Sequence, residues 1–450
     1  MKIVMIGGGG ASIVCANTLR LLGSQAQIDL YTRREQTAYT PCEQPFFLRD
    51  AVPYEDMFYA SPEWFAAKQI GLHTKRTVER IDREKKIIIA DGVEAPYDIL
   101  VINTGAKNKM PGIPGLTGER VYSLVTDIQS ARDIEAILQR SRHAVIMGGG
   151  IIGIEMAETL VRKGYASVSM LVSSGGLLSR QLDPDMAGVL EPVLKREGVC
   201  LYLNDTAASV VSDGRGIRLA LASGGSIDAD WILVAKGIVP DVELAREAGL
   251  KIGSTGGIKV NQYLQTSDPA IYAAGDCIEE RHMLSGKKFI NALATNSNRT
   301  GRLIARNIYF GNRVPFLGSL YTFGAELFGK TVISVGLTER TAREEGLEVI
   351  SVKTSGPTRK KIFDGRDIRI KLLADPEKQT LVGAQLIGPR EASRIGERII
   401  LMLGEQIPVA RISQYETIYS PPLSMAYDLI TNAADLLISK LLKMGQAVRW

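Results

Sequence analysis

The segment KIVMIGGGGASIVCANTLR, residues 2–20, decides the fold of the N-terminal part of the chain. It begins with a short apolar strand, continues through a run of glycines and ends in a stretch with the apolar spacing of a helix. A second apolar strand, QIDLYT at residues 27–32, follows it. Strand, glycine turn, helix and strand in this order predict a dinucleotide-binding unit, with the pyrophosphate at the N-terminus of the helix.

The same pattern recurs in HAVIMGGGIIGIEMAETLVRKG, residues 143–164, which the apolar strand SVSMLV follows at residues 167–172. Two such units predict two dinucleotide sites, one for FAD and one for NAD(P). Near Val314 the pattern changes, and strands expected at residues 331–337 and 368–375 precede helices near 390–404 and 425–444. The fold class is therefore expected to be α/β, with two Rossmann-like dinucleotide-binding domains and a C-terminal α+β domain.

The order of these units predicts a discontinuous first domain. Residues 1–110 and 240–315 are expected to form the FAD-binding domain. Residues 111–239 are expected to form the NAD(P)-binding domain, and residues 316–450 a separate α+β domain, to which the resemblance given below assigns dimerisation.

Composition narrows the class of protein. A chain of 450 residues is too long for one ordinary core, and its 45% apolar and 23% charged residues are typical of globular domains. The net charge of +5 gives little support for nucleic acid as a partner. Because no run of 18 apolar residues occurs and the N-terminus lacks signal-peptide features, we expect no membrane span and a cytoplasmic location. The four cysteines have no metal-ligand spacing, so no metal site is expected.

The first glycine turn departs from the usual pattern at two positions. Ser12 takes the third glycine position, and Thr32 stands where an acidic residue normally binds the ribose. Asp29 is in the middle of the strand and is expected to face outward. The residues expected to contact FAD here are Gly7, Gly9, Gly10, Ala11, Ser12, Thr32 and Arg33.

The second glycine turn has all three glycines, at positions 148, 150 and 153. Its second strand ends at Ser173, without the acid that favours NADH. An arginine there would favour NADPH, and Arg180 is the nearest in sequence, so the choice between NADH and NADPH stays open. The residues expected to contact the coenzyme are Gly148, Gly150, Ile152, Gly153, Glu155 and Ser173.

Taken together, these motifs resemble the pyridine nucleotide–disulfide oxidoreductase superfamily over essentially the whole chain. IYAAGDC, residues 271–277, resembles its second FAD motif and implies that Asp276 binds the ribityl chain. NTG, residues 103–105, resembles the crossover at the FAD site and implies contacts from Thr104 and Gly105. KGIVPD, residues 236–241, resembles the segment that leaves the NAD domain and places Gly237 at the coenzyme.

The resemblance extends to the helix expected at residues 292–308 and to the C-terminal domain. It implies that the helix directs its N-terminal dipole at the flavin, with Ala292 and Ala294 in contact. YSPPLSMAYD, residues 419–428, resembles the interface motif of the family. It implies a homodimer in which Tyr419 lies beside the partner's active site.

Cys42, in TPCEQPFFLRD at residues 40–50, carries the expected chemistry. The segment resembles the single-cysteine branch, which contains coenzyme A-disulfide reductases, NAD(P)H polysulfide or persulfide reductases, NADH oxidases and NADH peroxidases. Phe47 occupies the position of a second redox cysteine, so Cys42 is expected to act alone. The resemblance also implies that Pro41 contacts the flavin. The resemblance implies that electrons pass from NAD(P)H through FAD to Cys42, and then to a disulfide, polysulfide or coenzyme A-disulfide. Cys15, Cys200 and Cys277 are expected to be structural.

Alternative functions stay open. NADH oxidases of this branch carry a histidine in the first glycine turn, where this chain has Gly10, which argues against an oxidase. Coenzyme A-disulfide reductases carry a tyrosine pair where this chain has Lys361 and Ile362, which weakens the coenzyme A interpretation. Glu43 beside the thiol should raise its pKa if the two groups are close. A diaphorase that reduces ferredoxin or another iron–sulfur protein, with the basic run 359–361 at an acidic partner, is a second hypothesis. A non-catalytic nucleotide-binding regulator is the third.

Overall fold

The first glycine turn lies between a buried strand and a helix, as the sequence predicts. In the computed structural model, which describes residues 1–124, 128–173, 175–214 and 216–450, the strand β1 (Lys2–Ile6) leads into α1 (Gly10–Leu21) and β2 (Gln27–Tyr31). β1 is the central strand of a five-stranded parallel sheet in the order β19-β7-β1-β2-β3. Its other strands are β3 (Ile70–His73), β7 (Ile99–Ile102) and β19 (Ile271–Ala273).

The second unit repeats this arrangement. It consists of β10 (His143–Met147), α5 (Ile151–Arg162) and β11 (Ser167–Val172), and β10 is the centre of a parallel sheet in the order β12-β11-β10-β16-β9. Its other strands are β9 (Val121–Tyr122), β12 (Val199–Leu203) and β16 (Trp231–Val234). The buried strands are almost wholly apolar because helices or other layers cover both faces of the sheet.

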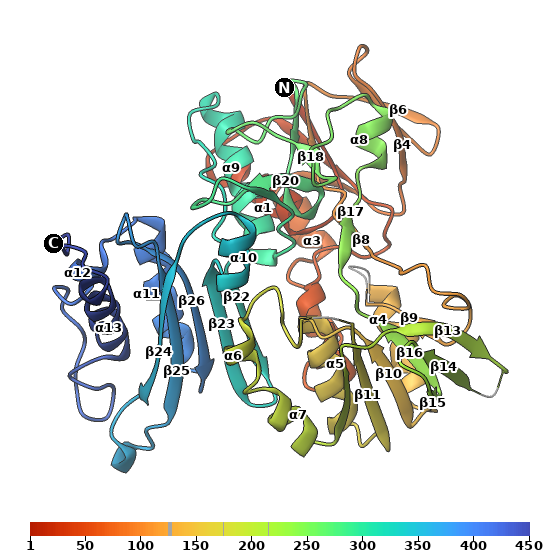
Figure 1. Cartoon of the computed structure of the whole chain (residues 1–450). Helices are drawn as coiled ribbons and strands as arrows, with labels where there is room; N and C mark the ends of the chain where they lie inside the picture. Colours follow the sequence, from red (N-terminus) through yellow and green to blue (C-terminus); the bar gives the residue numbers. More distant parts are fainter. Residues whose placement is uncertain (125–127, 174, 215) are drawn as a thin grey trace.

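Two extended segments join the first unit to the second. β8 (Ala106–Asn108) leads out of the first unit, and β17 (Ile238–Pro240) returns to it, and the two pair in antiparallel fashion. Figure 1 shows them running side by side between the two units. The two units are therefore connected by a short pair of hydrogen-bonded strands.

The C-terminal part forms an α+β unit, as expected. Its antiparallel sheet has the order β22-β23-β26-β25-β24, with β22 (Phe323–Leu327), β23 (Lys330–Gly336), β24 (Ile350–Pro357), β25 (Asp367–Ala374) and β26 (Leu381–Gly388). α11 (Ala392–Gly404) and α13 (Leu429–Lys443) pack on one face of it, and the dinucleotide-binding units lie toward the opposite side (Figure 1). α10 (Glu339–Glu344) and α12 (Val409–Ile412) complete this unit.

α9 (Ala294–Phe310) begins two residues later than the expected helix. Leu293, which precedes it, is extended, with φ −121° and ψ 136°, so Ala292 belongs to an extended segment and the prediction of a helical Ala292 is wrong. α9 packs closely on α1, because a Cβ at Gly301 would lie 2.2 Å from the carbonyl oxygen of Ala11.

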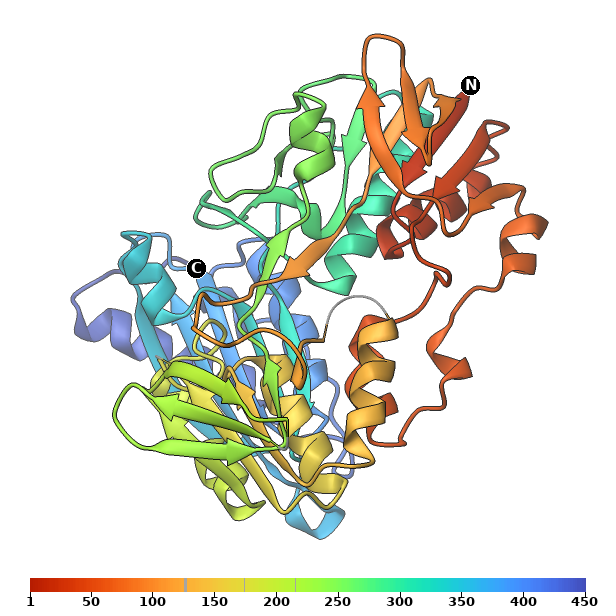
Figure 2. The ribbon, with the colours of Figure 1, turned by 90° about the vertical axis from the view of Figure 1, so that its right-hand side faces the viewer.

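Shorter elements cover the edges of these units, and Figure 2 shows them from the side. They are α2 (Gln44–Leu48), α3 (Pro62–Ala67), β4 (Val78–Asp82), β5 (Ile87–Ala90), β6 (Val93–Pro96), α4 (Ile128–Leu138), α6 (Pro184–Ala187), α7 (Glu191–Arg196), β13 (Ala207–Ser212), β14 (Ile217–Leu221), β15 (Ser226–Ala229), α8 (Glu243–Glu247), β18 (Ile258–Lys259), β20 (Ile278–Arg281) and β21 (Lys288–Phe289). No helix of the described ranges is long and apolar enough to cross a membrane.

Candidate functional site

A cleft of about 2090 Å³ lies between the two glycine turns and reaches the C-terminal unit. It brings together residues that are far apart in the sequence, from α1, α5, α9 and α10. The predicted site residues that line it are Gly7, Gly9, Gly10, Thr32, Arg33, Pro41, Cys42, Thr104, Gly105, Gly148, Gly150, Ile152, Glu155, Ser173, Gly237, Asp276, Ala292 and Ala294.

Three predicted contact residues do not line the cleft. Ala11 and Ser12 are fully buried where α1 packs against its surroundings. Gly153 has a packing role, because a Cβ there would lie 2.2 Å from the carbonyl oxygen of Gly148. These small residues allow the helix to pack closely on the strand and the turn before it, which is the role of the third small residue in such motifs.

The first turn has the geometry of a phosphate cradle. Gly7 has φ +104°, and a Cβ on it would lie 2.0 Å from the carbonyl oxygen of Asn103. Its amide donates to the carbonyl of Tyr31 at 2.8 Å, which ties the turn to the end of β2. The backbone is therefore bare at the N-terminus of α1, as the pyrophosphate of FAD requires.

The ribose end of this site lacks a carboxylate from β2. Thr32 is buried and lines the cleft, and Arg33 is exposed beside it. The expectation that Asp29 faces outward is wrong: it is buried, 3.5 Å from the ammonium of Lys2 and 3.1 Å from Nε2 of His73. A charged partner and a ring nitrogen offset the cost of burying its carboxylate, so Asp29 serves the sheet and not the nucleotide.

Asp276 presents a partly buried carboxylate to the cleft. Burial raises its pKa to about 6, although Ser297 donates a hydrogen bond to it at 3.1 Å and lowers the value. A carboxylate with so few donors is well suited to accept hydrogen bonds from polyol hydroxyls such as the ribityl chain. Together with the cradle at Gly7, it fits FAD.

Cys42 lies in the short 3-10 turn Pro41–Glu43, and its side chain is exposed to the cleft. Burial between the two units nevertheless raises the pKa of the thiol, and the carboxylates of Glu155, Asp276 and Glu43 raise it further. The expected effect of Glu43 is confirmed in direction, but Glu155 and Asp276 act more strongly. Sequence reasoning missed these two effects because both residues are remote from Cys42 along the chain.

The other three cysteines are outside the cleft. Cys15 and Cys277 are buried, and burial raises the pKa of both thiols, that of Cys277 to about 11. Cys200 lies in β12 and is exposed, so it contributes nothing to the core. Among the described residues, Cys42 is thus the cysteine that lines the cleft together with both glycine turns.

The second turn is shaped for a coenzyme. Gly148 has φ +136°, and a Cβ there would lie 2.2 Å from the carbonyl oxygen of Ala235. Glu155 follows on the first turns of α5, and burial raises its pKa to about 7. At the other end, Ser173 is exposed at the end of β11 and accepts a hydrogen bond from Nζ of Lys236 at 3.1 Å. Lys236 was missed in the sequence, although a cation directly after the buried strand β16 was a usable signal.

Two regions singled out in the C-terminal unit lie apart from the cleft. Tyr419 is 50% exposed and does not line the cleft within one chain. Arg359 pairs with Glu391 at 2.8 Å, so part of the basic run is neutralised within the chain.

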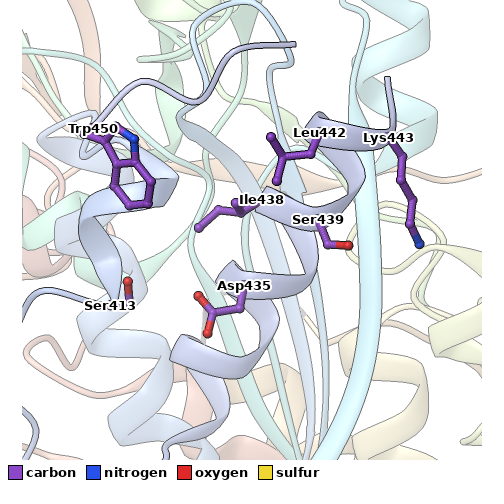
Figure 3. Close-up of a pocket in the computed structure, with 7 residues that line it drawn as sticks. All are labelled: Ser413, Asp435, Ile438, Ser439, Leu442, Lys443 and Trp450. Carbon is purple, nitrogen blue, oxygen red and sulfur yellow. The ribbon is translucent and has the colours of Figure 1, made fainter. Parts of the chain in front are cut away.

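A separate pocket of about 550 Å³ on α13, formed by Asp435, Leu442, Trp450 and their neighbours (Figure 3), holds none of the predicted site residues.

Comparisons with known proteins agree with this geometry. The family model "Pyridine nucleotide-disulphide oxidoreductase" matches residues 1–301, and the model of that family's dimerisation domain matches residues 328–428. An "NADH oxidase" of Methanocaldococcus jannaschii is 30% identical, over 98% of this chain and 99% of its own. An "NAD(P)H coenzyme A polysulfide/persulfide reductase" of Pyrococcus horikoshii is 31% identical, over 97% and 98%.

Solved structures show the same relationship. A NAD-dependent persulfide reductase from A. fulgidus superimposes with a TM-score of 0.94 at 31% identity, over 99% of this chain and 84% of that one. FAD and NAD(P)H are the cofactors of the family, and the two turns, Asp276 and the cleft fit both of them. The chain therefore belongs to the pyridine nucleotide–disulphide oxidoreductase family, and it is an FAD-dependent NAD(P)H oxidoreductase.

Proposed function

We propose that the chain reduces a small sulfur acceptor, of the disulfide, polysulfide or persulfide class, and that Cys42 is its redox-active thiol. The observation that carries the proposal is the position of Cys42, which lines one cleft together with both glycine turns and Asp276. The Pyrococcus horikoshii relative is named as a coenzyme A polysulfide/persulfide reductase, and the A. fulgidus neighbour as a persulfide reductase. Both names favour sulfur as the acceptor.

The thiol performs the reaction in two steps. The Cys42 thiolate attacks one sulfur of the acceptor, its S–S bond breaks, and the leaving sulfur departs as a thiolate that takes a proton. The new bond between Cys42 and the second sulfur then takes up two electrons and breaks, which restores the Cys42 thiolate and releases a second thiol. FAD, when bound, supplies those two electrons after accepting a hydride from NAD(P)H.

Charge around Cys42 controls the first step. The carboxylate of Glu155 raises the pKa of the thiol, and because its own pKa is about 7, that charge develops near neutral pH. Below this pH Glu155 is protonated and opposes the thiolate less. Glu155 is therefore a residue that holds or releases a proton in the cleft near neutral pH.

We further propose that the enzyme is a homodimer and that a second copy contributes Tyr419. The dimerisation domain matches residues 328–428, which include this tyrosine. Its side chain is half exposed in a single chain, so a partner can cover it. The phenol would donate a proton to the leaving thiolate, and Tyr419→Phe is expected to slow sulfur reduction while hydride transfer from NAD(P)H is retained.

Anaerobic titration of the FAD-loaded protein with NADH and with NADPH tests the proposal. Wild-type protein that has first reacted with coenzyme A-disulfide, so that Cys42 holds one half of it as a mixed disulfide, should take up two electron pairs per chain and then develop a thiolate–flavin charge-transfer band. Cys42→Ser should take up one pair, lose reduction of polysulfide and of coenzyme A-disulfide, and keep reduction of an artificial dye. Cys200→Ser, which changes an exposed cysteine outside the cleft, is the matched control and should behave as wild type.

The same experiment distinguishes the sulfur reductase from a ferredoxin-type diaphorase. If the Cys42→Ser protein keeps full turnover with every sulfur acceptor, the thiol mechanism is refuted. If wild-type protein that has reacted with coenzyme A-disulfide still takes up a single pair, Cys42 is not a redox centre and the diaphorase explains the fold better.

NADH oxidase activity is the second candidate, since the Methanocaldococcus jannaschii relative bears that name. The surroundings of Gly10 argue against it. The expected histidine is replaced by Gly10, and a Cβ there would lie 2.8 Å from Oδ1 of Asn298, so a histidine would require the Asn298 side chain to move. We expect oxygen consumption to be slower than sulfur reduction, and an oxygen electrode measures the ratio directly.

A further inference from the structure

The coenzyme end of the cleft contains an ammonium group without a counterion. Lys236 follows β16, and Ser173 follows β11, so the two residues flank the carboxyl end of the central strand β10. Nζ of Lys236 donates to Oγ of Ser173 at 3.1 Å. Within the described ranges, no carboxylate pairs with this lysine. Burial alone acts on it and lowers its pKa.

The position of Ser173 decides what that cation is for. In such units the adenosine ribose lies at the end of the second strand, where an acid binds its two hydroxyls in NADH-dependent proteins. Here a serine stands at that place, and Lys236 reaches it from the other side. An acid in place of Ser173 would pair with Lys236. Because a serine stands there, the positive charge of Lys236 is left for a ligand.

Two arginines surround the same loop. Arg180 is exposed, lines the cleft and has no hydrogen bond or ion pair within the described ranges. Arg340, from α10, approaches from the C-terminal unit: a Cβ at Gly175 would lie 3.3 Å from its Nη1. Its Nε is buried without a hydrogen-bond partner, although Glu344 lies 3.6 Å from it and neutralises part of its charge.

We propose that this chain prefers NADPH to NADH, and that Lys236 binds the 2′-phosphate of NADPH with help from Arg180 and Arg340. A phosphate monoester carries up to two negative charges and accepts several hydrogen bonds, which suits three cations around one loop. The inference rests on the proposed NAD(P)H-dependent function, and it adds the coenzyme and the residues that select it. Ser173 would donate to the same phosphate or to the adjacent ribose hydroxyl.

Fragment binding tests this without any turnover. Isothermal titration of the oxidised, FAD-loaded protein compares 2′,5′-ADP, which carries the 2′-phosphate, with 5′-ADP, which lacks it. A third arm uses 3′,5′-ADP, the fragment of coenzyme A. We expect 2′,5′-ADP to bind roughly tenfold or more tightly than either of the other fragments. This difference in affinity is typical of the loss of one hydrogen bond to a charged group.

Variants identify the residue responsible. Lys236→Met should reduce the preference for 2′,5′-ADP to about threefold or less, since it removes the charge that faces the phosphate. Ser173→Asp should reverse the preference, because the new carboxylate pairs with Lys236 and repels the phosphate. Lys107→Met is the matched control: it also lines the cleft but already pairs with Asp241 and Glu243, at 3.0 Å each, and should keep the wild-type preference.

Each outcome decides the matter. Equal binding of 2′,5′-ADP and 5′-ADP by the wild-type protein, or an unchanged preference in Lys236→Met, overturns the proposal. Tighter binding of 3′,5′-ADP would assign the cations to a coenzyme A group instead. Because Cys42 takes no part in fragment binding, a failure of the thiol chemistry would leave these results unaffected, and the two failures are distinguishable.

Discussion

The buried lysine between the second dinucleotide unit and the C-terminal sheet offers the sharpest test of how the domains are held together. Lys371, in β25, has a side chain only 4% exposed, and its Nζ lies 3.1 Å from Asp183, 2.9 Å from Asp185 and 3.1 Å from Glu339. Lys371→Met replaces the cation by an apolar chain of similar length. Three carboxylates then face one another across the domain boundary.

The expected loss follows from the burial of each carboxylate. Asp183 is 2% exposed, so water cannot replace the lost partner, and breaking a buried ion pair in this way costs about 3–5 kcal/mol. Asp185 and Glu339 are more than a third exposed and regain water, so they add little. Since 1 kcal/mol moves the melting temperature of a domain of this size by about 2–4 °C, the transition should fall by roughly 6 °C or more.

Differential scanning calorimetry of the FAD-loaded protein measures this loss. Lys353→Met removes a lysine that is 42% exposed and pairs with Asp185 alone, so it should cost about 1 kcal/mol or less. The double variant Lys371→Met, Asp183→Asn should recover part of the loss, because it also removes the buried carboxylate. If Lys371→Met melts within the range of Lys353→Met, or if the double variant is no better, the reasoning from burial is refuted.

Three other perturbations test separate parts of the structure. Gly7→Ala places a Cβ 2.0 Å from the carbonyl of Asn103 and should abolish FAD binding, measured by flavin absorbance, whereas Gly23→Ala, with φ +84° but open space around it, should keep its flavin. Glu155→Gln removes a charge that raises the pKa of Cys42, so alkylation of the FAD-loaded protein by iodoacetamide at pH 8 should be faster than in wild type, and an unchanged rate–pH profile would contradict the assignment. Burial alone would raise the pKa of Asp185, but Lys353 and Lys371 outweigh it and lower the value. Its stabilisation is therefore complete above the ordinary pKa of an aspartate and is lost as the pH falls through the lowered one, so the difference in melting temperature between wild type and Asp185→Asn should shrink in acid.

The local units were predictable because their signals are local. β1 with α1, and β10 with α5, each combine an apolar strand, glycines and a helical period within about twenty residues, and the structure has them where the sequence places them. The same holds for Cys42, whose place after β2 was enough to bring it into the cleft. Domain boundaries and the individual roles of the site residues stay predictions.

The errors concern interactions between segments that are far apart in the chain. Asp29 was expected to face outward because of its mid-strand position, and the sequence did not indicate that Lys2 and His73 would lie beside its carboxylate. The helix was expected to begin at Ala292, where the resemblance places its N-terminus, yet Leu293 is extended and the helix begins at Ala294. Propensity describes a residue's preference, and tertiary contacts decide where the helix begins.

The site is assembled from all three units, and this explains why its specificity escapes a search for motifs. A glycine turn reports that a dinucleotide binds, but the group that selects the coenzyme comes from the end of another strand, at Lys236, and from the C-terminal unit, at Arg340. Arg340 directly follows Glu339, which pairs with the buried Lys371, so the contact that holds the two units together also fixes α10 beside the coenzyme loop. Stability of the domain boundary and selection of the coenzyme thus depend on the same short helix, whereas Cys42 directly precedes α2, which packs on α5 of the second unit.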